Sequence, residues 1–248
     1  MHLTIERGVA TITLDSPDNR NALSQQLMDE LADHLDATRD DDDVRGVVLT
    51  ATGTTFCSGA DLRDPPVDRV SRGATLPQIL TTMWEFPKAV LVALNGHVRA
   101  GGTGLVAAAD IVVAPDQATF AFTEVKIGVA PAMIGVLCTR RMTPRSLFRY
   151  CLTGEVFSAV EARDAGLVTI VAAPDEVDDV VGSLVDAIRT TEPTAVRITK
   201  GLLHELPTMP VDVGFEHASE IGTKLFASEA AAEGMLAFRE KRPPRWAR

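Results

Sequence analysis

Two buried strands in this sequence each lead into a glycine-rich loop and a helix, and this repeated order constrains the fold most. The first instance covers residues 47–62 and the second covers residues 90–109. Each unit must bury its apolar face against its neighbours, so the repetition predicts alternating strands and helices in an α/β fold. Recurrence of one supersecondary unit is what a superhelix of ββα units would produce.

The rest of the chain continues this alternation and ends in helices. Alternating apolar residues on either side of Arg7-Gly8 predict a β-hairpin. Ser24 is the expected N-cap of a helix that runs to about Arg39. Further strands are expected over 44–51, 89–94, 111–114, 118–122 and 167–171. Further helices are expected over 76–86, 102–109, 134–140, 145–152, 158–164, 175–190, 194–205, 212–226 and 229–240. Prolines and Gly73 predict a mobile loop over 64–74.

Composition describes an acidic globular chain. Its 248 residues carry a net charge of −10, and 46% of them are apolar. That is ample material for a large core. With 5% aromatic residues and an acidic balance, the chain is a poor candidate for nucleic-acid binding, which needs a basic surface. The basic run from Arg239 to Arg248 is a local exception, and it coincides with one of the segments discussed below.

The cysteines and the termini point to a reducing compartment. Cys57, Cys138 and Cys151 are odd in number and far apart, so they fit neither a disulfide framework nor a metal site. The N-terminus lacks the basic and apolar regions of a signal peptide. No uncharged apolar run approaches the ~20 residues of a membrane span. We therefore expect a cytoplasmic protein with no membrane span.

The glycine loops are the first candidates for a functional site. Asn95-Gly96 and Gly101-Gly102 lead into a segment of small residues that predicts a helix. The first N–H groups of a helix have no intrahelical partner and lie at its positive end. If the two buried strands are neighbours, N–H groups from both loops could converge on one developing oxyanion. Ordinary tight connections are the alternative on this evidence alone.

Six segments of the sequence, in order, resemble one known family. They are NRNALS at 19–24, GTTFCSGADL at 53–62, LNGHVRAGGTGL at 94–105, AFTEVKIGVAP at 121–131, LTGEVFSAVEARDAGLV at 152–168 and EGMLAFREKRPPRW at 233–246. Together they resemble the enoyl-CoA hydratase/isomerase (crotonase) superfamily. The resemblance implies a crotonase-like spiral of ββα units over residues 1–190. It implies a C-terminal α-helical region over 191–248 that serves trimerisation and CoA contact, in a homotrimer or a hexamer made of two trimers.

The same resemblance implies the roles of individual residues. The backbone N–H groups of Ala60 and Gly101 would bind the thioester carbonyl, and Glu124 would be a catalytic acid/base. Asn21 to Leu23 and Ser58 to Leu62 would line the CoA groove. The implied substrate-binding residues are Ala22, Ser58, Asp61, Leu62, Arg63, Gly102, Pro131 and Lys241. Arg63 would approach the CoA phosphates, and Lys241 would reach CoA, with a neighbouring subunit as one route. The substrate is an acyl-CoA thioester, and neither a metal nor another cofactor is implied.

One position departs from the family pattern. Hydratases of this family carry a second glutamate where this sequence has Gly104, and Asp110 is expected to be structural rather than a substitute. A single carboxylate suffices to move a proton between two carbons. Three interpretations therefore stay open: a hydratase, a Δ3,Δ2-enoyl-CoA isomerase, and a non-catalytic acyl-CoA-binding homologue. A hydrolase would need a nucleophile beside a base, and no histidine is assigned beside Cys57 or Ser58.

Overall fold

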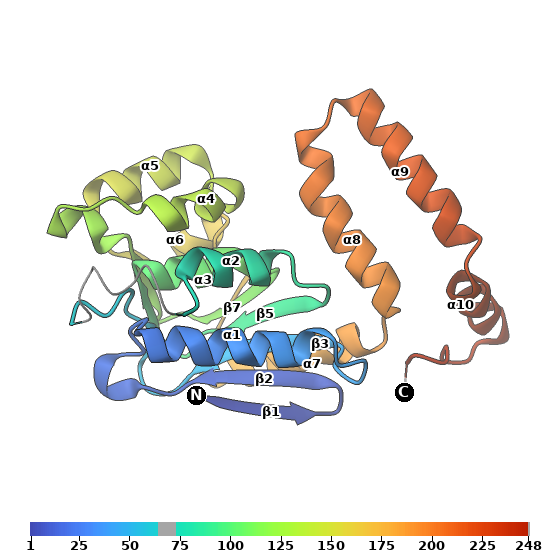
Figure 1. Cartoon of the computed structure of the whole chain (residues 1–248), viewed down its shortest axis with the longest axis horizontal. Coiled ribbons are helices and arrows are strands. Elements are labelled where there is room, and N and C mark those ends of the chain that lie inside the picture. Colours follow the sequence, from blue (N-terminus) through green and yellow to red (C-terminus); the bar gives the residue numbers. More distant parts are fainter. Residues whose placement is uncertain (64–72, 248) are drawn as a thin grey trace.

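The computed structural model describes residues 1–63 and 73–247 of the chain. Most of the loop predicted over 64–74 therefore lies outside the described residues. Within them the fold is mixed α/β, built on a large and a small sheet (Figure 1). The large sheet has the strand order β1-β2-β3-β5-β7-β10, formed by His2–Glu6, Val9–Leu14, Gly46–Ala51, Ala89–Ala93, Ile111–Pro115 and Ile170–Ala172. The small sheet has the order β4-β6-β8-β9, formed by Thr55–Cys57, His97–Arg99, Thr119–Ala121 and Phe157–Ser158.

Consecutive strands alternate between the two sheets. The chain passes from β3 to β4, from β5 to β6 and from β7 to β8, each time moving from the large sheet to the small one. A helix follows each pair, and strands of successive units pair in parallel. This is the predicted spiral of ββα units. Strands β4, β6 and β9 were not predicted, because strands of two or three residues carry little apolar pattern of their own. The equally short β8 and β10 were predicted because longer apolar runs, 118–122 and 167–171, overlap them.

The helices form close to their predicted bounds. They are α1 (Gln25–Arg39), α2 (Leu76–Trp84), α3 (Gly101–Ala108), α4 (Ala132–Arg141), α5 (Pro144–Thr153), α6 (Ala159–Asp164), α7 (Val177–Arg189), α8 (Pro193–Glu205), α9 (Val211–Phe226) and α10 (Glu229–Glu240). The side chain of Ser24 accepts a hydrogen bond from the Leu27 amide, so it caps α1 as predicted. Thr75 and Gln78 form a reciprocal capping box that starts α2.

The interior beneath the small sheet is aromatic. Phe120 of β8 and Phe157 of β9 are buried with ring centroids 5.6 Å apart, and Phe157 stacks on Tyr150 at 3.9 Å. Stacked aromatic pairs add to the stabilisation that burial of their area provides. This packing fixes the position of β8, which leads directly to Thr123 and Glu124.

Helices α8, α9 and α10 lie to one side of the sheets (Figure 1). They leave large apolar side chains exposed, among them Leu203, Val211, Phe215, Phe226 and Phe238. Phe238 is 85% exposed, which is unusual for a phenylalanine unless another surface covers it. The predicted boundary at residue 190 falls between α7 and α8, and the division into two regions stays a prediction. None of the helices in the described part of the chain is long and apolar enough to cross a membrane.

Candidate active site

Three predicted site residues follow three neighbouring strands at the same edge of the small sheet. Strands β4, β6 and β8 are parallel, so their carboxyl ends lie along one edge. Ala60 comes three residues after β4, Gly101 two residues after β6, and Glu124 three residues after β8. The Ala100 amide also donates to the Ala121 carbonyl at 3.0 Å, which joins the ends of β6 and β8. The topology therefore brings together the two predicted N–H donors and the predicted carboxylate.

The segments that contain Ala60 and Gly101 are in direct contact. Leu23 pairs with Ala60 as an isolated parallel bridge, in which Leu23 bonds the carbonyl of Gly59 and the amide of Asp61. Because N–H directions alternate along extended chain, the N–H of Ala60 faces away from Leu23. Gly59 has φ +91°, and a Cβ added to it would lie 3.2 Å from the Gly101 nitrogen. The two loops are thus neighbours, as the oxyanion-hole hypothesis requires.

Ala100, which immediately precedes the first turn of α3, has a strained backbone. Its φ is +46° and its ψ is −121°, a conformation that glycine adopts readily and alanine does not. Such residues cost of order 1–3 kcal/mol and occur often at functional sites. The strain accompanies the sharp turn that starts α3 at Gly101.

We expect Ala100→Gly to raise the stability of the protein. Glycine relieves the strain in the folded state, although it also increases the entropy of the unfolded chain, so the expected net gain is about 1 kcal/mol. Thermal or urea unfolding measures this change. A lower unfolding midpoint for the variant would show that the methyl group of Ala100 contributes packing that outweighs the backbone strain.

A groove of about 360 Å³ lies beside Ala60. It is lined by Asp18, Asn19, Arg20, Ala22, Ser58, Ala60, Asp61, Leu62 and Arg63. Five of the predicted substrate-binding residues are in this set. The carboxylate of Asp61 is buried and accepts hydrogen bonds from the backbone and guanidinium of Arg63, which hold its pKa well below the usual range. Arg63 itself is 73% exposed, so it lies at the mouth of the groove with its charge partly balanced by Asp61.

Two residues predicted to line the groove are instead buried supports. The Asn21 side chain is fully buried, donates to the carbonyls of Thr52 and Thr55, and accepts from the Ser16 amide. Leu23 is buried against the segment that contains Gly101. Neither side chain lines the groove beside Ala60, because a loop also needs buried polar and apolar residues of its own to hold it in place. That the segment Asn21 to Leu23 contacts CoA stays a prediction. They position the groove without facing it.

The other three predicted substrate contacts lie elsewhere. Gly102 is buried in α3, where an added Cβ would lie 2.8 Å from the Cβ of Cys57. Pro131 is half-buried and precedes α4. Lys241 is exposed and ends α10, in the group of helices that lies to one side of the sheets (Figure 1). Beside it, Arg242 binds the buried Glu233 at 2.8 Å and folds the tail back onto α10. Within one chain, the structure does not bring Lys241 to the groove.

Glu124 has the environment of a proton carrier. It lies in the 3-10 helix Thr123–Ile127, and its Oε2 is buried with no hydrogen-bond partner among the described residues. Burial raises the pKa of Glu124, since desolvation disfavours its charged form. Its charge in turn contributes to raising the pKa of two thiols, Cys138 to about 12 and Cys151 to about 11, although burial is the larger cause in both. A perturbed carboxyl group with an unused oxygen is a candidate general base.

We expect activity to decline on the acid side at a pH above the ordinary glutamate pKa of 4.5. A base works in its deprotonated form, so a raised pKa moves the acid limb of kcat/KM to higher pH. The pH dependence of kcat/KM for the free enzyme measures this limb. A limb at or below 4.5 would contradict the assignment of Glu124 as the base in its observed environment.

The other chemical candidates have structural partners. Asp110 accepts from the Val90 amide and from Lys200, both at 2.8 Å, as expected for a structural residue. Arg99 donates to the carbonyls of Val98 and Thr119. Burial raises the pKa of the Cys57 thiol to about 12, which opposes a nucleophilic role. In the part of the chain that the structure describes, no group of three or more His, Cys, Asp or Glu residues could hold a metal ion.

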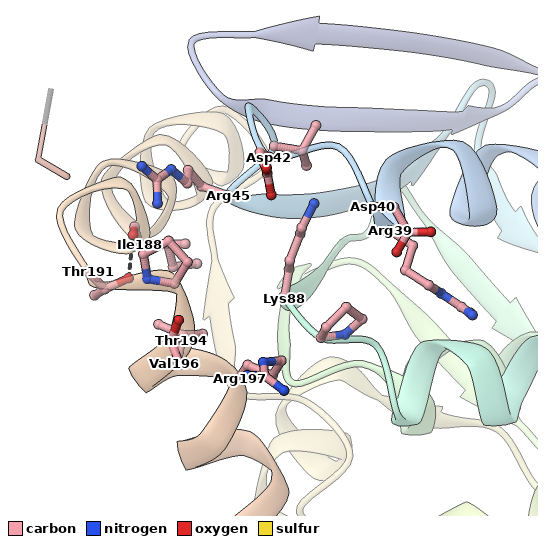
Figure 2. A pocket seen from close by; sticks show the side chains of 13 residues that line it. Arg39, Asp40, Asp42, Arg45, Lys88, Ile188, Thr191, Thr194, Val196 and Arg197 are labelled. Carbon is pink, nitrogen blue, oxygen red and sulfur yellow. Dashed lines mark hydrogen bonds between the residues drawn. The ribbon is translucent and has the colours of Figure 1, made fainter. Parts of the chain in front are cut away.

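A separate cavity of about 330 Å³ lies at the amino-terminal ends of β3 and β5 in the large sheet (Figure 2). Lys88 is one of its lining residues, and its ammonium group donates to the carbonyls of Thr38 and Asp41 near the end of α1. The basic side chains in Figure 2 point in different directions, and Asp40 and Asp42 lie among them. This cavity is therefore distinct from the predicted site and shows no convergence of charge on a common point.

Ile134 of α4 and Leu80 of α2 are two residues whose position beside Gly104 was not predicted from the sequence. Both are buried beside Gly104, the position where the resemblance led us to look for a carboxylate. The spacing of apolar residues places them on buried helix faces but does not show which helix they meet.

The fold brings the segments of Ala60 and Gly101 and the carboxylate of Glu124 to the carboxyl ends of parallel strands. Comparison with known proteins identifies the class. The family model "Enoyl-CoA hydratase/isomerase" matches residues 4–248. The chain belongs to the enoyl-CoA hydratase/isomerase family.

Relatives and solved structures agree with this assignment. A putative enoyl-CoA hydratase of Thermus thermophilus is 36% identical over 98% of this chain and 99% of the relative. A crystal structure of an enoyl-CoA hydratase from Mycobacterium smegmatis matches with a TM-score of 0.91 and 30% identity, over 100% of this chain and 98% of that one. A putative enoyl-CoA hydratase from Mycobacterium avium paratuberculosis matches with a TM-score of 0.74 and 42% identity, over 97% and 95%.

Proposed function

We propose that this family member acts on acyl-CoA thioesters through an enolate, with Glu124 as the acid/base. The observation that carries the proposal is the buried Oε2 of Glu124, which has no hydrogen-bond partner in the part of the chain that the structure describes. It lies at the sheet edge where the segments of Ala60 and Gly101 meet. An enolate needs a group that removes a proton from carbon and donors that accept charge on the carbonyl oxygen. Both parts have candidates at this edge.

In the proposed mechanism, the backbone N–H groups of Ala60 and Gly101 donate to the thioester carbonyl oxygen. As charge develops on that oxygen, the donors and the positive end of α3 stabilise it without reorganising. Glu124 removes a proton from the carbon next to the carbonyl, or delivers one to it. The groove lined by Ala22, Ser58 and Arg63 holds the CoA portion of the substrate.

Two reactions fit this enolate. Hydration of a 2-enoyl-CoA is the activity that the names of the relatives suggest. Conversion of a 3-enoyl-CoA to a 2-enoyl-CoA needs only one carboxylate, which suits a chain with glycine at position 104. A third candidate, an acyl-CoA-binding protein without catalysis, would keep the groove and the donors but use no base. The raised pKa of Glu124 and its buried Oε2, which has no partner among the described residues, favour catalysis over this third candidate, since binding alone needs no base.

Two substrates separate these candidates. Incubation with crotonyl-CoA and with a 3-enoyl-CoA is followed by the absorbance of the conjugated thioester. Loss of absorbance from the first reports hydration, and gain from the second reports isomerisation. If both signals stay constant while CoA binding is measured by calorimetry, the non-catalytic candidate replaces the proposed function.

We also propose that the chain assembles as a homotrimer or a hexamer. The support is the exposed apolar surface of α8, α9 and α10, which a second copy would cover. Helix α10, which ends at Lys241, also lies to one side of the sheets, from where Lys241 could reach the groove of a neighbouring copy (Figure 1). Sedimentation measures the assembly. The absence of a metal or additional cofactor, and the cytoplasmic location, stay predictions.

A further inference from the structure

We propose that Ile134 fills the space beside the active site that a side chain at position 104 would need, and that it thereby commits Glu124 to carrying a proton between carbons rather than activating water. This inference rests on the proposed function and names a residue that would set the reaction outcome. Ile134 lies near the start of α4 and is 2% exposed.

The geometry around Gly104 leaves no room for a second carboxylate. A Cβ built on Gly104 would lie 2.6 Å from Cγ2 and 3.3 Å from Cβ of Ile134, and 3.2 Å from Cδ1 of Leu80. Carbon atoms at optimal contact are about 3.5–4.0 Å apart, so even alanine at 104 would displace Ile134. Glycine at 104 and isoleucine at 134 are therefore complementary in shape. A change of either residue alone would disturb the packing between α3 and α4.

The same face of α4 also reaches the neighbourhood of Glu124. Cys138 lies one helical turn after Ile134, so the two side chains share a face. Cys138 interacts with Thr103, which precedes Gly104, and its thiol pKa also responds to the charge of Glu124. Hence the contact between α3 and α4 lies within electrostatic reach of the Glu124 carboxylate. Ile134 contributes an apolar side chain to that contact.

An apolar wall favours one of the two reactions. In isomerisation, Glu124 takes a proton from C2, the electron pair moves through the enolate as the double bond shifts from C3–C4 to C2–C3, and the proton is returned at C4. In hydration, a water oxygen forms a bond to C3, the C2–C3 double bond opens toward the thioester, one water proton passes to a base, and a proton is added at C2. Only hydration needs a held water, and an isoleucine side chain cannot hold one.

Three variants test this role: Ile134→Ala, Gly104→Glu and the double variant Ile134→Ala/Gly104→Glu. Each is assayed for hydration of crotonyl-CoA, isomerisation of a 3-enoyl-CoA, and exchange of the C2 hydrogen with deuterated water. We expect Ile134→Ala to raise the ratio of hydration to isomerisation. We expect Gly104→Glu alone to give no gain in hydration, and the double variant to hydrate about tenfold or more faster than either single variant.

The matched control is Ile12→Ala, which removes the same atoms from a buried position in β2 and should leave the ratio unchanged. Thermal melts of all variants identify those that fail to fold. Because Ile134→Ala introduces no steric clash, it tests the proposal even if Gly104→Glu unfolds the chain. An unchanged ratio in folded Ile134→Ala, or equal hydration by Gly104→Glu and the double variant, overturns the inference. Wild-type protein with no exchange and no turnover would instead refute the proposed function.

Discussion

Replacing Glu124 with glutamine is expected to lower kcat about 10²–10⁴-fold, the usual contribution of a positioned acid or base. Glutamine keeps the size of the side chain but cannot accept or deliver a proton at the substrate carbon. The groove beside Ala60 does not include Glu124, so CoA binding should be retained. Steady-state turnover and calorimetric titration with CoA, run on the same preparation, measure the two effects separately.

The matched control for this variant is Glu6→Gln, which removes an exposed carboxylate from β1. It should have wild-type turnover. The variant should also be at least as stable as the wild type, since burial of Glu124 disfavours its charged form and a neutral amide avoids that penalty. If Glu124→Gln kept full turnover, the carboxylate would have to be removed from the mechanism.

Gly59→Ala is expected to lower kcat about 10²–10³-fold, the effect of losing one donor of an oxyanion hole. The added methyl carbon would lie 2.7 Å from the Cβ of Ala100, and alanine would also be strained at φ +91°. Relief of this clash must move the segment of Ala60 away from the start of α3. The separation of the two N–H donors would then no longer match one oxygen.

Gly8→Ala provides a control for the backbone strain alone. Gly8 has φ +79° in the turn of the first hairpin, away from the small sheet, and an added Cβ would approach no atom closer than 3.2 Å. We expect both variants to be destabilised, Gly59→Ala more than Gly8→Ala because of its added clash, but loss of turnover only in Gly59→Ala. Equal turnover in the two variants, measured well below their melting temperatures, would show that the position of Ala60 is not critical.

Much of the fold was predictable because it depends on local patterns. Helix α1 was expected from Ser24 and from the spacing of Leu27, Leu31 and Leu35, and the structure has that cap and those buried residues. The alternation of strand, loop and helix indicated a spiral before its sheets were known. The assignment of β4 and β6 to a second sheet was not predictable, since three-residue strands gain their identity from pairing with neighbours rather than from their own composition.

The candidate site was predictable in position and less so in detail. Glycine loops and a carboxylate indicated backbone donors and a base, and the parallel strands bring their segments to one edge. The buried position of the Asn21 side chain was not predictable, because a polar residue beside a groove can equally form hydrogen bonds within its own loop. Ile134 was missed because shape complementarity between two helices depends on packing that no spacing rule describes.

The use of main-chain donors has a consequence for how this protein would respond to mutagenesis. The two groups proposed to hold the oxyanion belong to an exposed alanine and a buried glycine, and neither depends on the chemistry of a side chain. Alanine scanning would therefore report Glu124 and pass over Ala60, while Gly101→Ala would report the lack of space beside Leu23 rather than the N–H donor. The substitutions that lower activity most would lie at residues that set the backbone conformation, such as Gly59. Mutagenesis of this enzyme would therefore identify its turns more readily than the residues that donate hydrogen bonds to the substrate.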